Sequence, residues 1–100
     1  MAYERVMGLK VIDLERYSQY RQLIAPLMLR YGGRFLFDFA VSRDLISPDR
    51  QINRVFAARF PDPETKDRFF NDPEYRAIRE QYYNPSVAET HLLSEHLDVA

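Results

Sequence analysis

The chain has 100 residues, of which 46% are hydrophobic and 29% charged, and its 14 basic and 15 acidic residues give a formal net charge of -1. This length suits a single domain, 1–100, that buries roughly 60–70% of its unfolded surface, and the balanced charge argues against nucleic acid or an anionic membrane as a partner. The sequence has no cysteine, and it has no apolar run long enough for a signal peptide or a membrane span, so we expect a cytoplasmic protein without disulfides.

The first third of the chain predicts a strand, a helix and a glycine corner. Arg5–Ile12 alternates in the manner of a strand, and Asp13 is placed to cap the helix that follows. Leu14–Arg30 carries apolar and tyrosine side chains at helical spacing, although Pro26 predicts a kink or a division into two helical pieces. The pair Gly32–Gly33 then ends the helix, because glycine tolerates the left-handed conformation that closes it.

The rest of the chain predicts three strands and two short helices. Arg34–Ser42 and Asn53–Phe60 read as strands joined by a polar connection with a turn sequence. Two Asp-Pro-Glu sequences, each with a capping acid and a proline at the first helical position, predict helices at Pro63–Phe70 and Pro73–Tyr82. The last strand is predicted at Val87–Leu97, after an Asn-Pro that breaks the second helix.

The order βαββαβ predicts a ferredoxin-like fold of class α+β: a four-stranded antiparallel sheet with the helices on one face. We call the other face of the sheet the open face. A symmetric connection between the second and third strands predicts that paired residue numbers add up to about 97. Phe37 then lies opposite Phe60 on the helix-covered face, and Asp38 lies opposite Arg59 on the open face.

The predicted open face mixes apolar groups with a few charges. Its expected members are Val6, Gly8, Lys10, Leu36, Asp38, Ala40, Val55, Ala57 and Arg59, together with either the His91 set or the Thr90 set of the last strand. Such a broad face is too apolar to remain in water. Two sheets packed face to face would cover it, so we expect a homodimer.

Several short motifs, spread over Val6–Glu95, resemble the family catalogued as domain of unknown function 1330. They are Lys10-Val11-Ile12-Asp13, the tyrosines Tyr17 and Tyr20, Tyr31-Gly32-Gly33-Arg34-Phe35, Phe60-Pro61, and Asp72-Pro73-Glu74-Tyr75 followed by Arg79. The resemblance implies a dimeric α+β barrel, in a superfamily that includes small monooxygenases, haem-degrading enzymes and muconolactone isomerases. It implies no particular reaction.

The candidate catalytic residues are Asp38, Arg59 and His91, with Lys10 nearby. An aspartate beside an arginine and a lysine in a cleft can orient an acid or move a proton, but the same groups can form a cross-strand salt bridge at a dimer interface. His91 is a candidate base or metal ligand, or else a structural histidine. The other histidine, His96, is expected on the opposite strand face, and no cluster has metal-binding spacing, so we predict no metal.

A second group of candidates binds rather than reacts. Arg34 and Arg79 are able to clamp a carboxylate at one mouth of the barrel, or to cap the carbonyls of the first helix. Tyrosines at helical spacing line a pocket for a flat ligand, or form a core with a wet edge. The predicted ligand-binding residues are Lys10, Tyr20, Arg34, Tyr75 and Arg79, and no cofactor is expected.

Two functions are compatible with these patterns. The first is binding of a small organic, acidic molecule in the barrel, with or without monooxygenase- or isomerase-like chemistry that needs no cofactor. The second is a structural or interaction dimer whose barrel is filled by side chains. A cavity of a few hundred Å³ favours the first and a packed barrel the second. An RNA-recognition motif shares the order of elements, but its basic third strand with aromatic residues on the open face is not predicted here.

Overall fold

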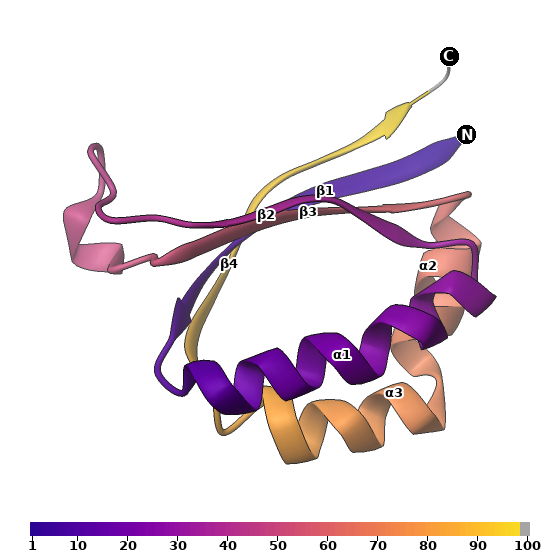
Figure 1. Ribbon diagram of the computed structural model, residues 1–100. Coiled ribbons are helices and arrows are strands. Elements are labelled where there is room, and N and C mark those ends of the chain that lie inside the picture. The colour runs from indigo at the N-terminus through magenta and orange to yellow at the C-terminus, as the bar shows by residue number, and fades with distance from the viewer. Residues whose placement is uncertain (99–100) are drawn as a thin grey trace.

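The computed structural model describes residues 1–98, which form a four-stranded sheet and a layer of helices. The elements are β1 (Ala2–Val11), α1 (Leu14–Arg30), β2 (Arg34–Ala40), a 3-10 turn (Pro48–Arg50), β3 (Arg54–Phe60), α2 (Pro63–Asn71), α3 (Pro73–Ile78), a π-helical turn (Arg79–Tyr83) and β4 (Val87–Asp98). All neighbouring strands are antiparallel, in the order β2-β3-β1-β4. The helices cover one face only (Figure 1), which confirms the predicted α+β, ferredoxin-like order.

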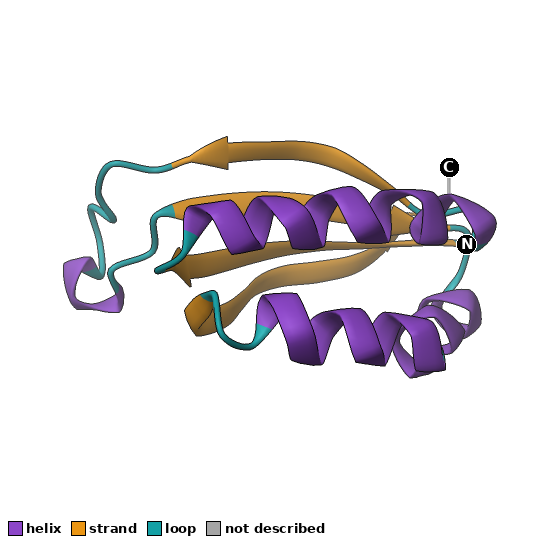
Figure 2. Cartoon of the chain, turned by 60° about the horizontal axis from the view of Figure 1, so that its bottom comes forward, coloured by secondary structure: helices purple, strands orange, loops and turns teal. Residues whose placement is uncertain are grey.

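The helices begin where the sequence supplies an aspartate cap. Asp13 accepts a hydrogen bond from the backbone of Arg16 at the start of α1. Asp62 caps α2 and Asp72 caps α3 in the same way, each followed by proline at the first helical position. On the covered face of the sheet, α1 runs alongside the segment formed by α2 and α3 (Figure 2).

The helix α1 runs through Pro26 as one element of 17 residues, so of the two predicted alternatives, a kink or a division into two pieces, the division was wrong. Proline removes one backbone donor, but the buried face of the helix, which includes Ile24 and Leu27, packs on the sheet and holds the segment together. The glycine corner behaves as predicted. Gly32 has a φ of 70° and donates to the carbonyl of Leu29 over 2.9 Å, which closes the helix.

The core lies between the sheet and the helices and is largely aromatic. Its buried members are Tyr3, Leu9, Tyr17, Tyr20, Ile24, Leu27, Met28, Ala58, Phe60, Phe69, Tyr75 and Tyr83. Their rings form a contact chain, with Phe69 in the middle: it packs 4.6 Å from Tyr75 and 5.3 Å from Phe60, measured between centroids. These rings meet tilted or edge to face, the arrangements that aromatic pairs prefer.

The predicted register of β2 against β3 was wrong, because β2 contains a bulge. Phe35 lies opposite Ala58, but Phe37 lies opposite Ala57, so Leu36 is an extra residue. An extra residue reverses the alternation of every side chain beyond it. Asp38 therefore lies opposite Phe56 and not opposite Arg59.

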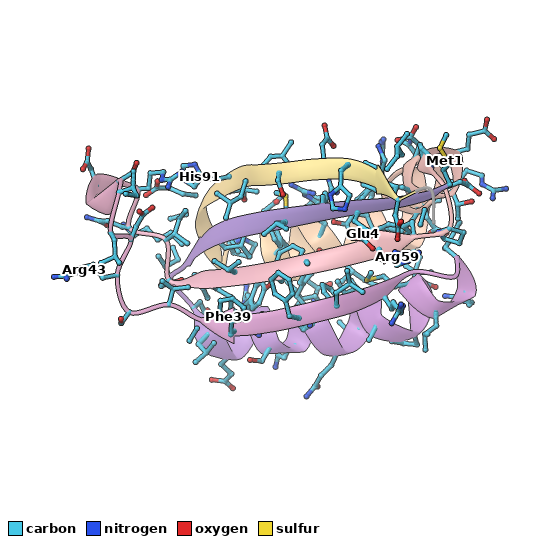
Figure 3. All side chains as sticks on the ribbon, turned by 90° about the horizontal axis from the view of Figure 1, so that it is seen from above. Met1, Glu4, Phe39, Arg43, Arg59 and His91 are labelled. Carbon is cyan, nitrogen blue, oxygen red and sulfur yellow. The ribbon has the colours of Figure 1, made fainter. Side chains whose placement is uncertain are left out.

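The bulge moves two phenylalanines to the open face. Phe37 and Phe39 were predicted to face the core, but they are 41% and 51% exposed and stack on each other with ring centroids 5.3 Å apart. Asp38 and Ala40 take the opposite face, which α1 covers. Figure 3 views the open face, with Phe39, Glu4, Arg59 and His91 labelled on it.

A second bulge, in β4, corrects the placement of the histidines. Val6 pairs with Ser94 and Met7 with Leu92, so one residue of β4 is unpaired between them. His91, which lies opposite Gly8, and His96, which lies opposite Glu4, are consequently on the same open face, and the prediction that they point to opposite faces was wrong.

Candidate functional site

A cavity of about 170 Å³ lies between the sheet and the helices. Its walls are mostly aromatic and aliphatic and come from every layer: Met7 from β1, Ile24 from α1, Phe35 from β2, Phe56 from β3, and Phe70 from α2. The cavity exists because the large rings of the core do not fill the space under the twisted sheet. Three of the predicted ligand-binding residues line it together: Tyr20, Tyr75 and Arg79.

The polar lining of the cavity consists mainly of four buried tyrosines. The hydroxyls of Tyr20 and Tyr75 are 3.0 Å apart, and that of Tyr83 is 2.6 Å from Oγ1 of Thr90. The hydroxyl of Tyr17 is buried and has no hydrogen-bond partner among residues 1–98. Burial, with a contribution from the charge of Asp38, raises the pKa of Tyr17 far above its usual 10.0. The hydroxyl is therefore a neutral donor at physiological pH.

Two arginines bring positive charge to the cavity. Arg79 donates through Nη1 to the hydroxyl of Tyr75 over 3.3 Å, and its guanidinium carbon lies 4.7 Å above the ring of Tyr83. The guanidinium of Arg5 lies 4.2 Å above the ring of Phe70. Because the rings of Phe70 and Tyr75 are themselves in contact, 5.3 Å between centroids, both arginines are associated with the same group of rings.

A π-helical turn places Arg79 and Tyr83 on the same side. The amide of Asn84 donates to the carbonyl of Arg79 over 2.9 Å, five residues back, which makes this turn wider than an α-helical one. In the wider turn Arg79 and Tyr83 lie above one another and both line the cavity. Such turns occur frequently at functional sites.

The described residues that line the cavity include no carboxylate and no imidazole. The lining therefore offers hydrogen-bond donors and positive charge, but no side chain suited to act as a general base at neutral pH. In chemical terms such an arrangement is suited to an anion rather than to proton abstraction.

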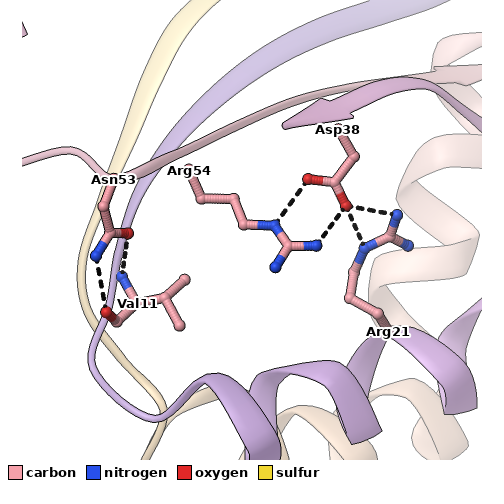
Figure 4. Close-up of polar contacts among 5 residues, drawn as sticks. All are labelled: Val11, Arg21, Asp38, Asn53 and Arg54. Atoms are coloured by element: carbon pink, nitrogen blue, oxygen red, sulfur yellow. Dashed lines mark hydrogen bonds and ion pairs between the residues drawn. The ribbon is translucent and has the colours of Figure 1, made fainter. Parts of the chain in front are cut away.

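Asp38 lies next to the cavity wall, in an ion cluster with two arginines (Figure 4). Its carboxylate accepts from Nε of Arg54 over 2.8 Å and from Nη2 of Arg21 over 2.8 Å. Burial raises the pKa of Asp38, but the hydrogen bonds from Arg54 and Arg21 outweigh it and hold that pKa below the usual 3.8. Arg54 also lies 4.7 Å above the ring of Tyr17, so the cluster positions the tyrosine that has the unpaired hydroxyl.

The other predicted catalytic residues lie elsewhere, on the open face. Arg59 forms ion pairs with Glu4 and Asp98 (Figure 3). His91 has Nε2 3.1 Å from Glu89, and Lys10 lies opposite Glu89 in the register of β1 and β4. The predicted constellation of Asp38 with Arg59 and Lys10 therefore does not form, because the bulge in β2 turns Asp38 to the other face.

Arg34 and Arg79 were predicted to converge at one mouth of the barrel, and they do not. Arg34 lines a second, more polar cavity of about 340 Å³, together with Arg59, Gly32 and Pro61. It lies at the end of the sheet that holds the glycine corner, whereas Arg79 lines the cavity under the sheet.

The sequence interpretation missed several residues of the site. Arg5 had a signal: in a strand it shares a face with Met7 and Leu9, so a charged residue interrupts the core side of that strand. For Tyr83 the sequence offers no such signal, because no residue pattern predicts the π-helical turn that directs its side chain inward. Arg21 and Arg54 are recognised only once the register of β2 is known.

No helix within residues 1–98 is long and apolar enough to cross a membrane. No group of three or more His, Asp or Glu side chains in the same range is arranged to hold a metal ion.

Solved structures with this architecture come from bacteria and from plants. A protein of unknown function from Rhodopseudomonas palustris aligns with a TM-score of 0.83 at 18% identity, over 99% of this chain and 83% of its own. A dimeric ferredoxin-like protein of unknown function from Jannaschia sp. CCS1 has a TM-score of 0.74 at 12% identity, over 98% and 100%. The hydroxynitrile lyase of Passiflora edulis has a TM-score of 0.67 at 8% identity, over 99% and 95%. At these identities the likeness establishes the fold alone.

Comparison of the sequence with curated proteins gives no match. A family profile does match, over residues 2–95, which is nearly the whole chain. Its description is "Domain of unknown function (DUF1330)", and the match includes the glycine corner and the Pro-Glu-Tyr helix start that first indicated it. The chain belongs to the DUF1330 family.

Proposed function

We propose that this protein binds a small organic molecule in the cavity between the sheet and the helices. The observation that carries the proposal is Tyr17, which lines the cavity and whose buried hydroxyl has no hydrogen-bond partner among the described residues. A buried polar group without a partner costs about 1–3 kcal/mol. A ligand that accepts a hydrogen bond from Tyr17 would remove that cost.

The size and lining of the cavity support a small ligand. A cavity of about 150 Å³ in a protein core is large enough to hold a benzene molecule. The volume of about 170 Å³ is therefore suited to a compound of about one ring. Walls that are mostly apolar, with a few polar groups at fixed places, are typical of small-molecule sites.

Catalysis is a further step within the same proposal. A hydroxynitrile lyase shares this fold at 8% identity, so the architecture accommodates an enzyme site. Monooxygenase- or isomerase-like chemistry in this cavity would rely on an activated ligand, because its lining supplies donors and no base. The alternative, a structural dimer with a filled interior, is disfavoured by the cavity.

We also propose that the protein is a cytoplasmic homodimer, in which two copies pack their open faces together. The face carries Phe37, Phe39, Val55 and Ala57 in one continuous area of β2 and β3, and the phenylalanines are half exposed. Packing against a second sheet would bury them. Two structural neighbours described as dimeric support this arrangement.

The experiment is native mass spectrometry of the purified protein, followed by a small-molecule fragment screen read by ligand-observed NMR. The test variant is Ala58→Leu, which extends a side chain from β3 into the cavity. The control is Ala25→Leu, on the exposed side of α1. We expect the wild type and the control to retain or bind small molecules and Ala58→Leu to lose them while keeping a cooperative unfolding transition. Absence of binding to the wild type, or equal binding to Ala58→Leu, would refute the proposal.

A further inference from the structure

Four of the six half-buried arginines among residues 1–98 pair with carboxylates. Arg21 and Arg54 share Asp38, Arg59 pairs with Glu4, and Arg50 with Asp44. These pairs compensate charge that the fold removes from water. A half-buried arginine that lacks such a partner is therefore an exception that requires an explanation.

Arg79 and Arg5 are two such exceptions, and both line the cavity. Within residues 1–98 neither has a carboxylate at ion-pair distance: Arg79 contacts the hydroxyl of Tyr75, and Arg5 lies over the ring of Phe70. Glu95 is the cross-strand neighbour of Arg5, but its carboxylate accepts a hydrogen bond from Tyr3, whose hydroxyl also interacts with Arg5. The cavity thus has two arginines without a carboxylate at ion-pair distance among the described residues.

The contacts of the two arginines leave them prepared for an anion. Each guanidinium lies against an aromatic ring, an arrangement that restricts its orientation and leaves its N–H groups available at the edge. Arginine in this state forms charge-assisted hydrogen bonds with a carboxylate, often two at once. No acidic side chain among the described lining residues would repel the anion.

The remainder of the cavity indicates what the anion is attached to. Phe35 and Phe56 offer flat aromatic contacts, and Ile24 an aliphatic one, to a ligand that contains about one ring. The hydroxyl of Tyr17 offers one further donor. On the basis of the proposed function, we infer that the ligand is a small aromatic monocarboxylate, with its carboxylate at Arg79 and Arg5 and an acceptor oxygen at Tyr17.

The test compares an acid with its uncharged isostere. The probes are 4-hydroxybenzoate and 4-hydroxybenzamide, measured by isothermal titration calorimetry at pH 7 and low salt. We expect the acid to bind at least about 10-fold more tightly than the amide, because only the acid forms charge-assisted hydrogen bonds. Arg79→Met should weaken binding of the acid about 10- to 100-fold and leave binding of the amide nearly unchanged.

Two further variants separate the effect of charge from an unspecific effect of the substitution. Arg79→Lys retains the charge and should recover part of the affinity for the acid. Arg16→Met, at an exposed position of α1, is the matched control and should change nothing. Equal binding of acid and amide, or no binding of the acid, overturns this inference. The proposed function is tested separately. It fails only if the wild type binds no fragment in the screen, or if Ala58→Leu binds fragments as well as the wild type does.

Discussion

Arg21 of α1 donates a hydrogen bond to Asp38 of β2 over 2.8 Å, which ties an edge strand of the sheet to a helix that walls the cavity. The guanidinium of Arg21 also lies 3.3 Å above the ring of Phe35, so charge and aromatic packing hold the same two elements together. Arg54 completes the cluster from β3 and contacts Tyr17. The cluster thus holds α1, β2 and β3 together beside the cavity. Its one carboxylate, that of Asp38, is bonded to two arginines and does not line the cavity.

Replacing Asp38 by alanine should destabilise the protein. The side chains of Asp38, Arg21 and Arg54 are 13%, 19% and 22% exposed, so removal of the carboxylate leaves two largely buried guanidiniums without a partner. We expect a loss of about 2 kcal/mol in the free energy of unfolding, measured by urea denaturation. The control is Asp67→Ala, whose pair with Lys66 leaves the aspartate 64% exposed and should contribute less than about 0.5 kcal/mol. A similar urea midpoint for both variants would contradict this prediction.

The contribution of Asp38 to stability should also depend on pH. Its pKa is below 3.8 in the folded protein, so on acidification the unfolded chain binds the proton first. The stabilisation is therefore present above about pH 4 and disappears as the pH falls through the folded-state pKa. We expect the difference in urea midpoint between wild type and Asp38→Asn to shrink between about pH 6 and about pH 2. Other carboxylates titrate in both proteins and cancel, so a constant difference would argue against this linkage.

The sequence was sufficient for the order of elements and for the residues at which the helices begin. Capping aspartates, two prolines and the glycine corner are local signals, and the structure has a helix boundary at each of them. Tyr20 and Tyr75 are both buried in the core, with their hydroxyls 3.0 Å apart.

The sequence was insufficient wherever one residue changes the phase of a strand. Leu36 in β2 fits a regular alternation as well as a bulged one, and the choice depends on pairing with β3. For this reason the partners of Asp38 and the faces of Phe37 and Phe39 were mispredicted. The site was affected most, because Asp38 lies on β2 beyond the bulge and Tyr83 lies in the π-helical turn.

The glycine corner gives a prediction about backbone strain. Gly32→Ala would place a Cβ in a left-handed conformation and only 2.8 Å from the ring of Pro61, which has no free rotation to move away. We expect a loss of at least about 1 kcal/mol in thermal unfolding experiments. In Gly8→Ala the new Cβ would lie 2.7 Å from Cδ1 of Ile52, the end of a flexible side chain, and φ is ordinary. The second variant should therefore lose less, and the reverse ranking would contradict this account of the corner.

The open face gives the last prediction, which concerns assembly. Phe39→Glu places a charge in the middle of the apolar area that we propose to be the homodimer interface, where a buried and unpaired carboxylate would be costly. We expect sedimentation velocity to show a dimer for the wild type and a monomer for this variant. Leu29→Glu, at an exposed position of α1, is the control and should remain a dimer. The cavity residues all belong to one protomer, so the monomeric variant should still bind the small ligand. A wild-type monomer, or a dimer that survives Phe39→Glu, would show that the open face is covered in another way.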